Sequence, residues 1–332
     1  MTKELANLYS GKKIVITGCT GYIAGALISS LKYADVAILG ISRSEKLPAA
    51  DIRYLQGSLS EYSIWEKIID FADIIFHLAG NTSVYTAAND PEQSFVSSVL
   101  PVMHLIRAAK TKGKKVRVVY ASTATLYGLP ETFPVNEHTI PEPVTVYDLH
   151  KMFAENELKF ANSQQLLDSV SLRLANVYGP STATSASDDR GIVNRLTKQA
   201  LQGVDIKVYG HGNYLRDYVY IDDVVNCFLL GGVVNGICGK SFVVASGSSI
   251  TVYEAFKIIA EEVARISGSE VAVSKINWPE NADPIEKRNF VVDTRNFEIA
   301  FGWRPQTPFR EGVKEMVRIF SNLENKKKRA QA

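Results

Sequence analysis

A tyrosine and a lysine four residues apart, Tyr147 and Lys151, form a candidate acid–base pair. On a helix this spacing places both side chains on one face. A phenol can give a proton to an alkoxide or take one from a hydroxyl. Its pKa of about 10 must fall before it works near neutrality, and a nearby ammonium lowers it. The same pair is common on surface helices, so taken alone it is read as structural.

A glycine-rich turn, TGCTGYIAG at residues 17–25, follows the first predicted strand. Gly18 permits a tight turn, and Gly21 lets the backbone approach a pyrophosphate at the start of the next helix. The third small position is Ala24, which allows the helix to lie close to the sheet. Glycine-rich turns are common, but the position between first strand and first helix favours a dinucleotide site.

The end of the second predicted strand indicates which dinucleotide would bind. Sites for NAD commonly place an acidic residue there to hold the ribose 2′-hydroxyl, whereas an arginine accommodates the 2′-phosphate of NADP. Here the position is Ser42, followed by Arg43. With no competing carboxylate and a guanidinium that can bind phosphate through two hydrogen bonds, NADP(H) is preferred and NAD(H) remains possible. Alternatively, Arg43 is an ordinary surface residue.

Short apolar runs alternate with helical periodicity over the first half of the chain, and they predict the elements that position these residues. Such an alternation indicates an α/β fold, a doubly wound parallel sheet of the Rossmann type. We expect a dinucleotide-binding domain over 1–179, with returning segments around 205–250, and a smaller substrate lobe mainly over 180–332. A Ser/Thr/Ala-rich loop at 181–187 leads into that lobe. The strands are expected at 13–17, 36–41, 52–56, 74–77, 116–121, 169–174 and 242–245, and the helices at 23–32, 63–71, 95–112, 151–165, 192–202 and 252–266.

Composition excludes several functional classes. The 332 residues carry 37 basic and 35 acidic side chains, a net charge of +2, which argues against nucleic-acid binding. The three cysteines are too far apart for a zinc site and do not make a disulfide framework, so no metal is expected. Apolar runs such as 74–76 and 228–230 are too short to span a bilayer, and the polar amino terminus lacks a signal peptide. A cytoplasmic protein is expected, with 326–329 (KKKR) as a solvated, frayed tail.

Several motifs in order along the chain resemble the extended short-chain dehydrogenases/reductases, in the branch that acts on nucleotide-linked sugars. They are TGCTGYIAG, HLAGNTS at 77–83, YASTATLYG at 120–128, YDLHK at 147–151, LRLANVYGP at 172–180, RDYVYIDDVV at 216–225 and FGWRP at 301–305. The resemblance covers nearly the whole chain. It implies a catalytic triad of Thr123, Tyr147 and Lys151, in which Thr123 orients the reacting oxygen.

The resemblance also implies binding residues. A diphosphate clamp is expected from Arg216 and Arg288, and an aromatic flank for the nucleotide base from Tyr209. Alternatively, each arginine forms a surface ion pair, Arg216 with Asp217, and Tyr209 is a strand-end aromatic. The remaining substrate candidates are Ser83 and Asn176. The implied cofactor contacts are Gly18, Thr20, Gly21, Tyr22, Ile23, Ser42, Arg43, Ser58, Leu59, Leu78, Ala79, Gly80, Tyr147 and Lys151.

The chain also departs from the family pattern. Ser58 stands where many relatives have an Asp, and Ser98 and Pro101 replace the usual Asn and Gly. Within YDLHK, Asp148 is expected to face solvent, and His150 is interpreted as a packed helix residue.

Two positions after the catalytic Thr restrict the reaction. Sugar 4,6-dehydratases of this family carry Asp-Glu there, and the related decarboxylases keep the Glu; here the pair is Ala124-Thr125. Without those carboxylates, both elimination and decarboxylation are disfavoured. The main hypothesis is an NADPH-dependent reduction of a nucleotide-linked 4-keto-6-deoxy sugar with Tyr147 as proton donor. The alternative is a nucleotide-sugar 4-epimerase that retains its NAD(P). A third possibility is a sensor that binds the dinucleotide without chemistry.

The resemblance further implies a homodimer, because helices 95–112 and 147–165 match the pair that makes a four-helix dimer contact in the family. Apolar positions on the first of these, such as Val99, Val102 and Ile106, are equally explained by the protein core.

Overall fold

The computed structural model describes residues 3–45, 52–181 and 191–331. Its centre is a seven-stranded sheet in the order β10-β6-β5-β4-β1-β2-β3, with every neighbouring pair parallel. Each strand overlaps one predicted from sequence, which confirms the doubly wound α/β fold. The strands are β1 (Lys13–Thr17), β2 (Ala37–Ser42), β3 (Arg53–Gln56), β4 (Ile74–His77), β5 (Arg117–Thr123), β6 (Asp168–Leu174) and β10 (Lys240–Val244).

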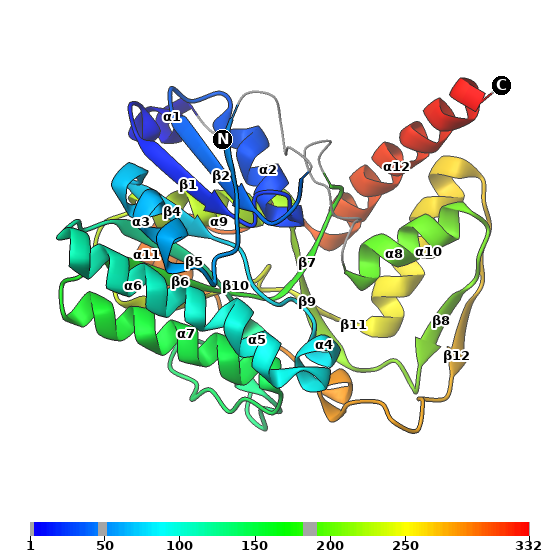
Figure 1. Cartoon of the computed structure of the whole chain (residues 1–332). Helices are drawn as coiled ribbons and strands as arrows, with labels where there is room; N and C mark the ends of the chain where they lie inside the picture. The colour runs from blue at the N-terminus through cyan, green and yellow to red at the C-terminus, as the bar shows by residue number, and fades with distance from the viewer. Residues whose placement is uncertain (1–2, 46–51, 182–190, 332) are drawn as a thin grey trace.

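Helices cover both faces of the sheet, which is why its central strands are apolar throughout. On one face lie α3 (Tyr62–Phe71), α6 (Leu100–Lys112) and α7 (Val146–Ser163), which share a hydrophobic core with β4 and β5. On the other lie α1 (Lys3–Tyr9), α2 (Tyr22–Leu31), α9 (Ile221–Val233) and α11 (Arg295–Phe301). Figure 1 shows this layering, with α2 and α7 on opposite sides of the strands.

One predicted helix, 95–112, is two helices. The chain forms α5 (Pro91–Ser98), passes through Val99 and starts again as α6. Pro101 lies in the first turn of α6, where its missing N–H is tolerated, but it cannot continue a helix that began further upstream. The break places α5 beside the sheet edge where the predicted binding residues gather.

The second lobe holds small sheets of its own. The strands β7 (Asn176–Tyr178), β9 (Leu215–Tyr220) and β11 (Ser249–Thr251) form one, and β8 (Ile206–Tyr209) pairs with β12 (Val273–Ile276). Between them the chain returns to the large sheet as α9 and β10. Helices α8 (Ile192–Leu201), α10 (Val252–Ser267) and α12 (Phe309–Gln331) complete the lobe beside them (Figure 1).

Two sequence expectations concern the loop and the tail. Apart from Ser181, the loop expected at 181–187 lies outside the described residues. The expectation that residues 326–329 form a frayed tail is wrong, because their backbone continues helix α12. Among the described residues, no helix has the length and apolar character that a membrane span requires.

Candidate active site

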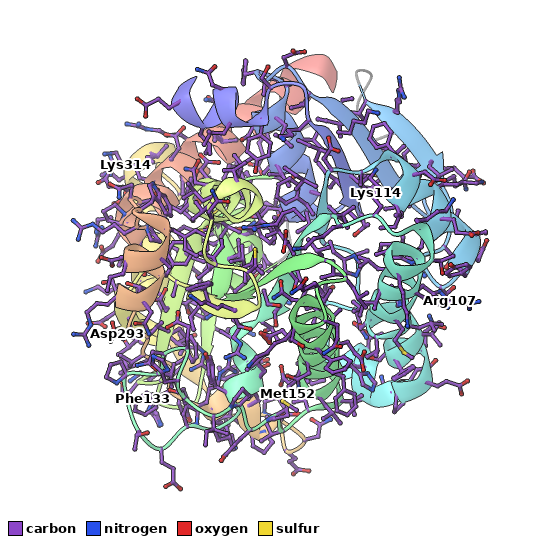
Figure 2. All side chains as sticks on the ribbon, turned by 90° about the vertical axis from the view of Figure 1, so that its left-hand side faces the viewer. Arg107, Lys114, Phe133, Met152, Asp293 and Lys314 are labelled. Atoms are coloured by element: carbon purple, nitrogen blue, oxygen red, sulfur yellow. The ribbon has the colours of Figure 1, made fainter. Side chains whose placement is uncertain are left out.

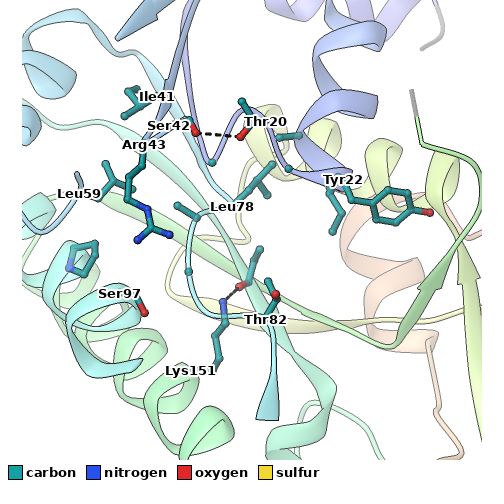
Figure 3. A pocket seen from close by; sticks show the side chains of 18 of the residues that line it. Thr20, Tyr22, Ile41, Ser42, Arg43, Leu59, Leu78, Thr82, Ser97 and Lys151 are labelled. Carbon is teal, nitrogen blue, oxygen red and sulfur yellow. Dashed lines mark hydrogen bonds between the residues drawn. The ribbon is translucent and has the colours of Figure 1, made fainter. Parts of the chain in front are cut away.

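A pocket of about 680 Å³ opens at the carboxyl ends of β1, β2, β4 and β5 (Figure 3). This is the edge where parallel α/β sheets bind ligands, because the loops after the strands meet there. The pocket is lined by every residue predicted to contact the cofactor and by Thr123. Sequence reasoning missed Gln93, Val96 and Ser97, which α5 contributes; no motif marks them, and only the helix break brings them to the edge.

The phosphate cradle has the backbone geometry that its glycines predict. Gly18 has φ +66°, and a Cβ there would lie 3.0 Å from the Cα of Ala79. The loops after β1 and β4 can therefore approach this closely only with glycine at that position. Helix α2 begins after Gly21 and has no acidic residue in its first turn, so its positive end is free for a phosphate. Ala24 is buried beneath the turn.

No carboxylate lines the described pocket, and Arg43 and Lys151 are its charged side chains. At the end of β2, the Ser42 hydroxyl lies 3.0 Å from that of Thr20 and accepts a hydrogen bond from the Ser44 N–H at 3.1 Å. Figure 3 shows the Arg43 side chain extending across the pocket mouth beside Leu59. These cations and the end of α2 make the pocket suitable for an anionic ligand.

A buried histidine fixes the loop opposite the cradle. The hydroxyl of Thr17 accepts hydrogen bonds from the N–H groups of Leu78 and Ala79, at 3.1 and 3.2 Å. Its own proton can then be donated to His77 Nδ1, 2.8 Å away, which requires the neutral imidazole with its proton on Nε2. Complete burial, with the nearby Lys151 charge, lowers the pKa of His77 to about 3. A neutral His77 thus helps to hold two backbone positions of the pocket.

The three predicted catalytic side chains come together in this pocket. Lys151 Nζ donates to the carbonyl of Ala121 at 2.8 Å and lies 6.0 Å from the centre of the Tyr147 ring. Burial lowers the pKa of Lys151 to about 8, and the carboxylate of Glu155 partly opposes that effect. For the Tyr147 phenol, burial raises the pKa, Asp148 raises it further, and a hydrogen bond with Thr123 lowers it.

The expectation that Asp148 faces solvent is wrong. Its side chain is fully buried, and its two oxygens accept hydrogen bonds from the hydroxyls of Thr125 and, at 2.6 Å, Thr145. The cause is the start of α7: Thr145 caps the helix by accepting the Asp148 N–H at 3.2 Å. This turns the carboxylate toward the strand end rather than outward. His150 is packed, with Nδ1 2.9 Å from the Ser94 hydroxyl.

Arg216 and Arg288 lie together outside this pocket. Arg216 is buried and donates to the backbone carbonyls of Glu286, at 2.7 Å, and of Arg288. These two residues belong to a short 3₁₀ helix, Pro284–Lys287, and its C-cap. The alternative of an Arg216–Asp217 ion pair does not hold, because the Asp217 carboxylate accepts the N–H groups of Ser246 and Ser248 instead. Among the described residues, the buried Nε of Arg288 has no hydrogen-bond partner, while Nη1 donates to the carbonyl of Ile285 at 2.7 Å.

The other three predicted substrate residues do not line the described pocket. Ser83 caps the short helix α4 (Val84–Asn89), and the amide of Asn176 donates to the Asp217 carbonyl at 2.9 Å. Tyr209 stacks on Trp278 with ring centres 5.2 Å apart at the β8–β12 pair. Immediate neighbours, Thr82 beside Ser83 and Ala175 beside Asn176, do line it.

Comparisons with known proteins agree with this geometry. The model of the NAD dependent epimerase/dehydratase family matches residues 14–245. The chain is 28% identical to a UDP-glucose 4-epimerase of Mycolicibacterium smegmatis over 93% of its own length and 99% of that protein. It is 26% identical to UDP-glucuronic acid decarboxylase 1 of Danio rerio, over 93% of this chain and 73% of the other.

Solved structures give the same result. The UDP-glucose 4-epimerase of Thermotoga maritima, solved with UDP-glucose, superposes with a TM-score of 0.84 at 25% identity, covering 94% of this chain and 99% of that one. The UDP-glucose 4-epimerase of Thermus thermophilus, solved with NAD, gives 0.78 at 25% identity, covering 93% and 98%. With its cradle, its Thr–Tyr–Lys cluster and these matches, the chain belongs to the NAD dependent epimerase/dehydratase family, in the nucleotide-sugar branch of the extended short-chain dehydrogenases/reductases.

Proposed function

We propose that the protein is a nucleotide-sugar 4-epimerase that keeps its nicotinamide dinucleotide bound. The observation that carries the proposal is the opening of the Thr123–Tyr147–Lys151 cluster into the same pocket as the phosphate cradle. The likeness to 4-epimerases over almost the whole length of both chains supports it over the reductase hypothesis. A nicotinamide dinucleotide fits the residues present, because the cradle is closed to any side chain at Gly18 and none of the described residues that line the pocket is a carboxylate.

In this mechanism the side chains of the protein remove one proton from the substrate and return it. A bound nicotinamide dinucleotide would supply the hydride acceptor and donor for the sugar carbon. Tyr147 removes the proton from the sugar hydroxyl during oxidation and returns it to the new alkoxide after the ketose has rotated. The Thr123 hydroxyl orients the reacting oxygen, and the ammonium of Lys151 favours the phenolate through its charge. Gly18, Gly21 and the start of α2 would hold the pyrophosphate.

The substrate diphosphate is assigned to Arg216 and Arg288. Arg216 is buried and Arg288 is half-buried, and desolvation together with the neighbouring Arg216 charge lowers the pKa of Arg288 to about 10. Two neighbouring cations of this kind are stabilised by a bound dianion. We further assign Tyr209, with Trp278 stacked on it, to the nucleotide base, and Ser83 and Asn176 to the sugar side of the cleft.

A second candidate, an NADPH-dependent 4-ketoreductase, is favoured by one observation. The end of β2 offers Ser42 and Arg43 where an acidic residue would hold the 2′-hydroxyl of NAD. Elimination and decarboxylation are less well supported, even though a decarboxylase is among the relatives, because the two positions after Thr123 are Ala124 and Thr125. Among the described residues the lining has no carboxylate, and Asp148 is fully buried.

One assay separates the candidates. The protein as purified is given UDP-hexoses and, separately, 4-keto-6-deoxy nucleotide sugars with NADPH or NADH, with Tyr147→Phe as matched control. Interconversion of 4-epimers without net change in nicotinamide absorbance is the expected result. Stoichiometric NADPH consumption with the keto sugars would replace the epimerase by the reductase. Binding of dinucleotide without turnover of any sugar would support a sensor.

We also propose a homodimer through the α5–α6 and α7 face. Val99 and Val102 are buried in the core and do not bear on it, but Phe95, Phe153 and Phe160 are exposed there. Figure 2 shows α6 and α7 side by side on this face, with Arg107 and Met152 on it. Exposed aromatic side chains on adjacent helices are typical of a contact surface.

A further inference from the structure

Asp148 is a buried carboxylate that the proposed mechanism does not use. A charged group excluded from water has to be compensated by hydrogen bonds or by an opposite charge. Its oxygens accept the hydroxyls of Thr125 and Thr145. The charges that face it from other elements are Arg288, which lowers its pKa, and Asp283, which raises it; burial is the largest influence and raises it.

From Asp148 a line of hydroxyls leads to the catalytic phenol. Thr125 has a single hydroxyl proton and donates it to Asp148 Oδ1. Its oxygen lies 2.7 Å from that of Thr123, so the proton in that contact must come from Thr123. Thr123 also accepts the Thr125 N–H at 3.2 Å. With its own proton committed, Thr123 can only accept a hydrogen bond from Tyr147, whose pKa it lowers. While Asp148 is ionised, the hydroxyl protons of both threonines therefore point toward it.

The mechanism needs the state in which the hydrogen bonds of this chain run the other way, from Asp148 toward Tyr147. If the phenol proton moves to Thr123, that of Thr123 to Thr125, and that of Thr125 to Asp148 Oδ1, each threonine loses and gains one proton. The net result is a Tyr147 phenolate that accepts from Thr123, and a neutral Asp148. Because Asp148 is neutral when Tyr147 is ionised in this way, the phenolate forms without the repulsion by which the Asp148 carboxylate raises the pKa of Tyr147.

We propose that Asp148 is a positioning residue that exchanges the proton of the Tyr147 phenol through Thr123 and Thr125. The proposal rests on the acid–base role proposed for Tyr147. Because Asp148 is fully buried, it acts through the two threonines and does not touch the substrate. Tyr147 and Asp148 share one proton over the pH range in which the two groups together carry one negative charge. Within that range the fraction of Tyr147 present as phenolate does not change with pH.

Variants of three residues test the chain. Thr125→Val removes the middle hydroxyl at nearly constant shape, and Thr125→Ser restores it. Asp148→Asn keeps an acceptor for Thr125 but cannot take up the proton. Thr145→Val is the control, since it removes the other hydrogen bond to Asp148 and the helix cap while leaving the chain intact. Thermal unfolding of each variant establishes that it is folded.

The first measurement is the pH profile of turnover. We expect a flat profile near neutrality for the unchanged protein and for Thr145→Val, and a rise of about tenfold per pH unit for Asp148→Asn, because its phenol must then lose the proton to solvent. We expect a loss of tenfold or more for Thr125→Val and recovery in Thr125→Ser. A flat profile in Asp148→Asn, or unchanged turnover in Thr125→Val, would overturn the proposal.

The second measurement needs no substrate and separates failure of the chain from failure of the proposed function. Phenolate absorbance is titrated in the unchanged protein and in Asp148→Asn, each minus the same protein with Tyr147→Phe. We expect the Tyr147 phenolate to form at lower pH in Asp148→Asn, since the carboxylate charge is gone. The same onset in both would overturn the proposal whatever the protein's substrate. A shift without turnover of any sugar would reject the epimerase and show that the Asp148 charge acts on the phenol. A Thr125→Val titration that left the phenolate onset of the unchanged protein in place would then overturn the proton exchange.

Discussion

The buried His77 gives the most direct test of the electrostatics beneath the cofactor cradle. The folded protein holds its pKa at about 3, against the ordinary 6.5. Below pH 6.5 the unfolded chain therefore binds a proton that the folded protein does not, and stability falls as pH falls through this window. The contribution of His77 is fully present above pH 6.5 and is lost progressively toward pH 3.

The magnitude follows from linkage. Each pKa unit between the two states is worth about 1.4 kcal/mol. At pH 4.5, two units below the ordinary value, the unchanged protein should have lost about 2.7 kcal/mol of unfolding free energy through His77 alone. In His77→Asn, an amide oxygen can still accept the Thr17 proton, but nothing titrates. Loss of ring packing against Trp65 and Tyr120 lowers the stability of this variant at every pH.

The assay is urea unfolding of the unchanged protein and His77→Asn at pH 7 and pH 4.5. The stability advantage of the unchanged protein over the variant should shrink by about 2.7 kcal/mol on acidification. His138→Asn, the same substitution at an exposed histidine, is the control for replacing a histidine by asparagine. If the difference between the unchanged protein and His77→Asn stayed the same at both pH values, a neutral buried His77 would be refuted.

Three further predictions concern the cofactor, the catalytic cation and the dimer. Lys151→Met should slow turnover about 100-fold at saturating cofactor. Lys151 Nζ lies 6.0 Å from the centre of the Tyr147 ring, and opposite charges at about that separation interact by about 2.8 kcal/mol at an effective dielectric constant of about 20. The same exchange at Lys159 on α7 is the control, and a loss below fivefold would contradict the role. Arg43→Ala should weaken NADPH binding tenfold or more and leave NADH binding unchanged in calorimetry, since hydrogen bonds to a charged phosphate are worth about 1.5–3 kcal/mol; equal effects on both would make Arg43 a surface residue. Phe160→Glu should shift a dimer to monomers in light scattering, and a monomeric unchanged protein would remove the proposed interface.

Features that neighbouring residues set could be predicted from the sequence, whereas features that distant residues create together could not. The strand ends, the glycine turn and the Tyr147–Lys151 spacing are set by neighbouring residues, so hydrophobic periodicity and turn chemistry locate them. The cofactor residues that the glycine turn and the family resemblance predicted all line one pocket. The break between α5 and α6 was missed because helical periodicity continues across it, although Pro101 marks it.

The substrate side was predicted less well because its residues come from distant parts of the chain. Arg216 and Arg288 are 72 positions apart, and only the folded second lobe brings them together. The surface ion pair considered between Arg216 and Asp217 does not form for the same reason. The Asp217 carboxylate instead accepts a hydrogen bond from the N–H of Ser246, 29 residues away in the sequence.

The sequence by itself determined the sheet, the cradle and the candidate catalytic side chains, because a strand followed by a glycine turn and a helix folds by local rules that tertiary contacts reinforce. The burial of Asp148 was decided by tertiary structure, to which the local cap from Thr145 adds. Its place next to Tyr147 on a polar helix start is equally compatible with solvent, and only the meeting of α7 with the end of β5 buries it against Thr125. Burial and hydrogen-bond direction arise where elements meet, so a pattern along one element cannot specify them.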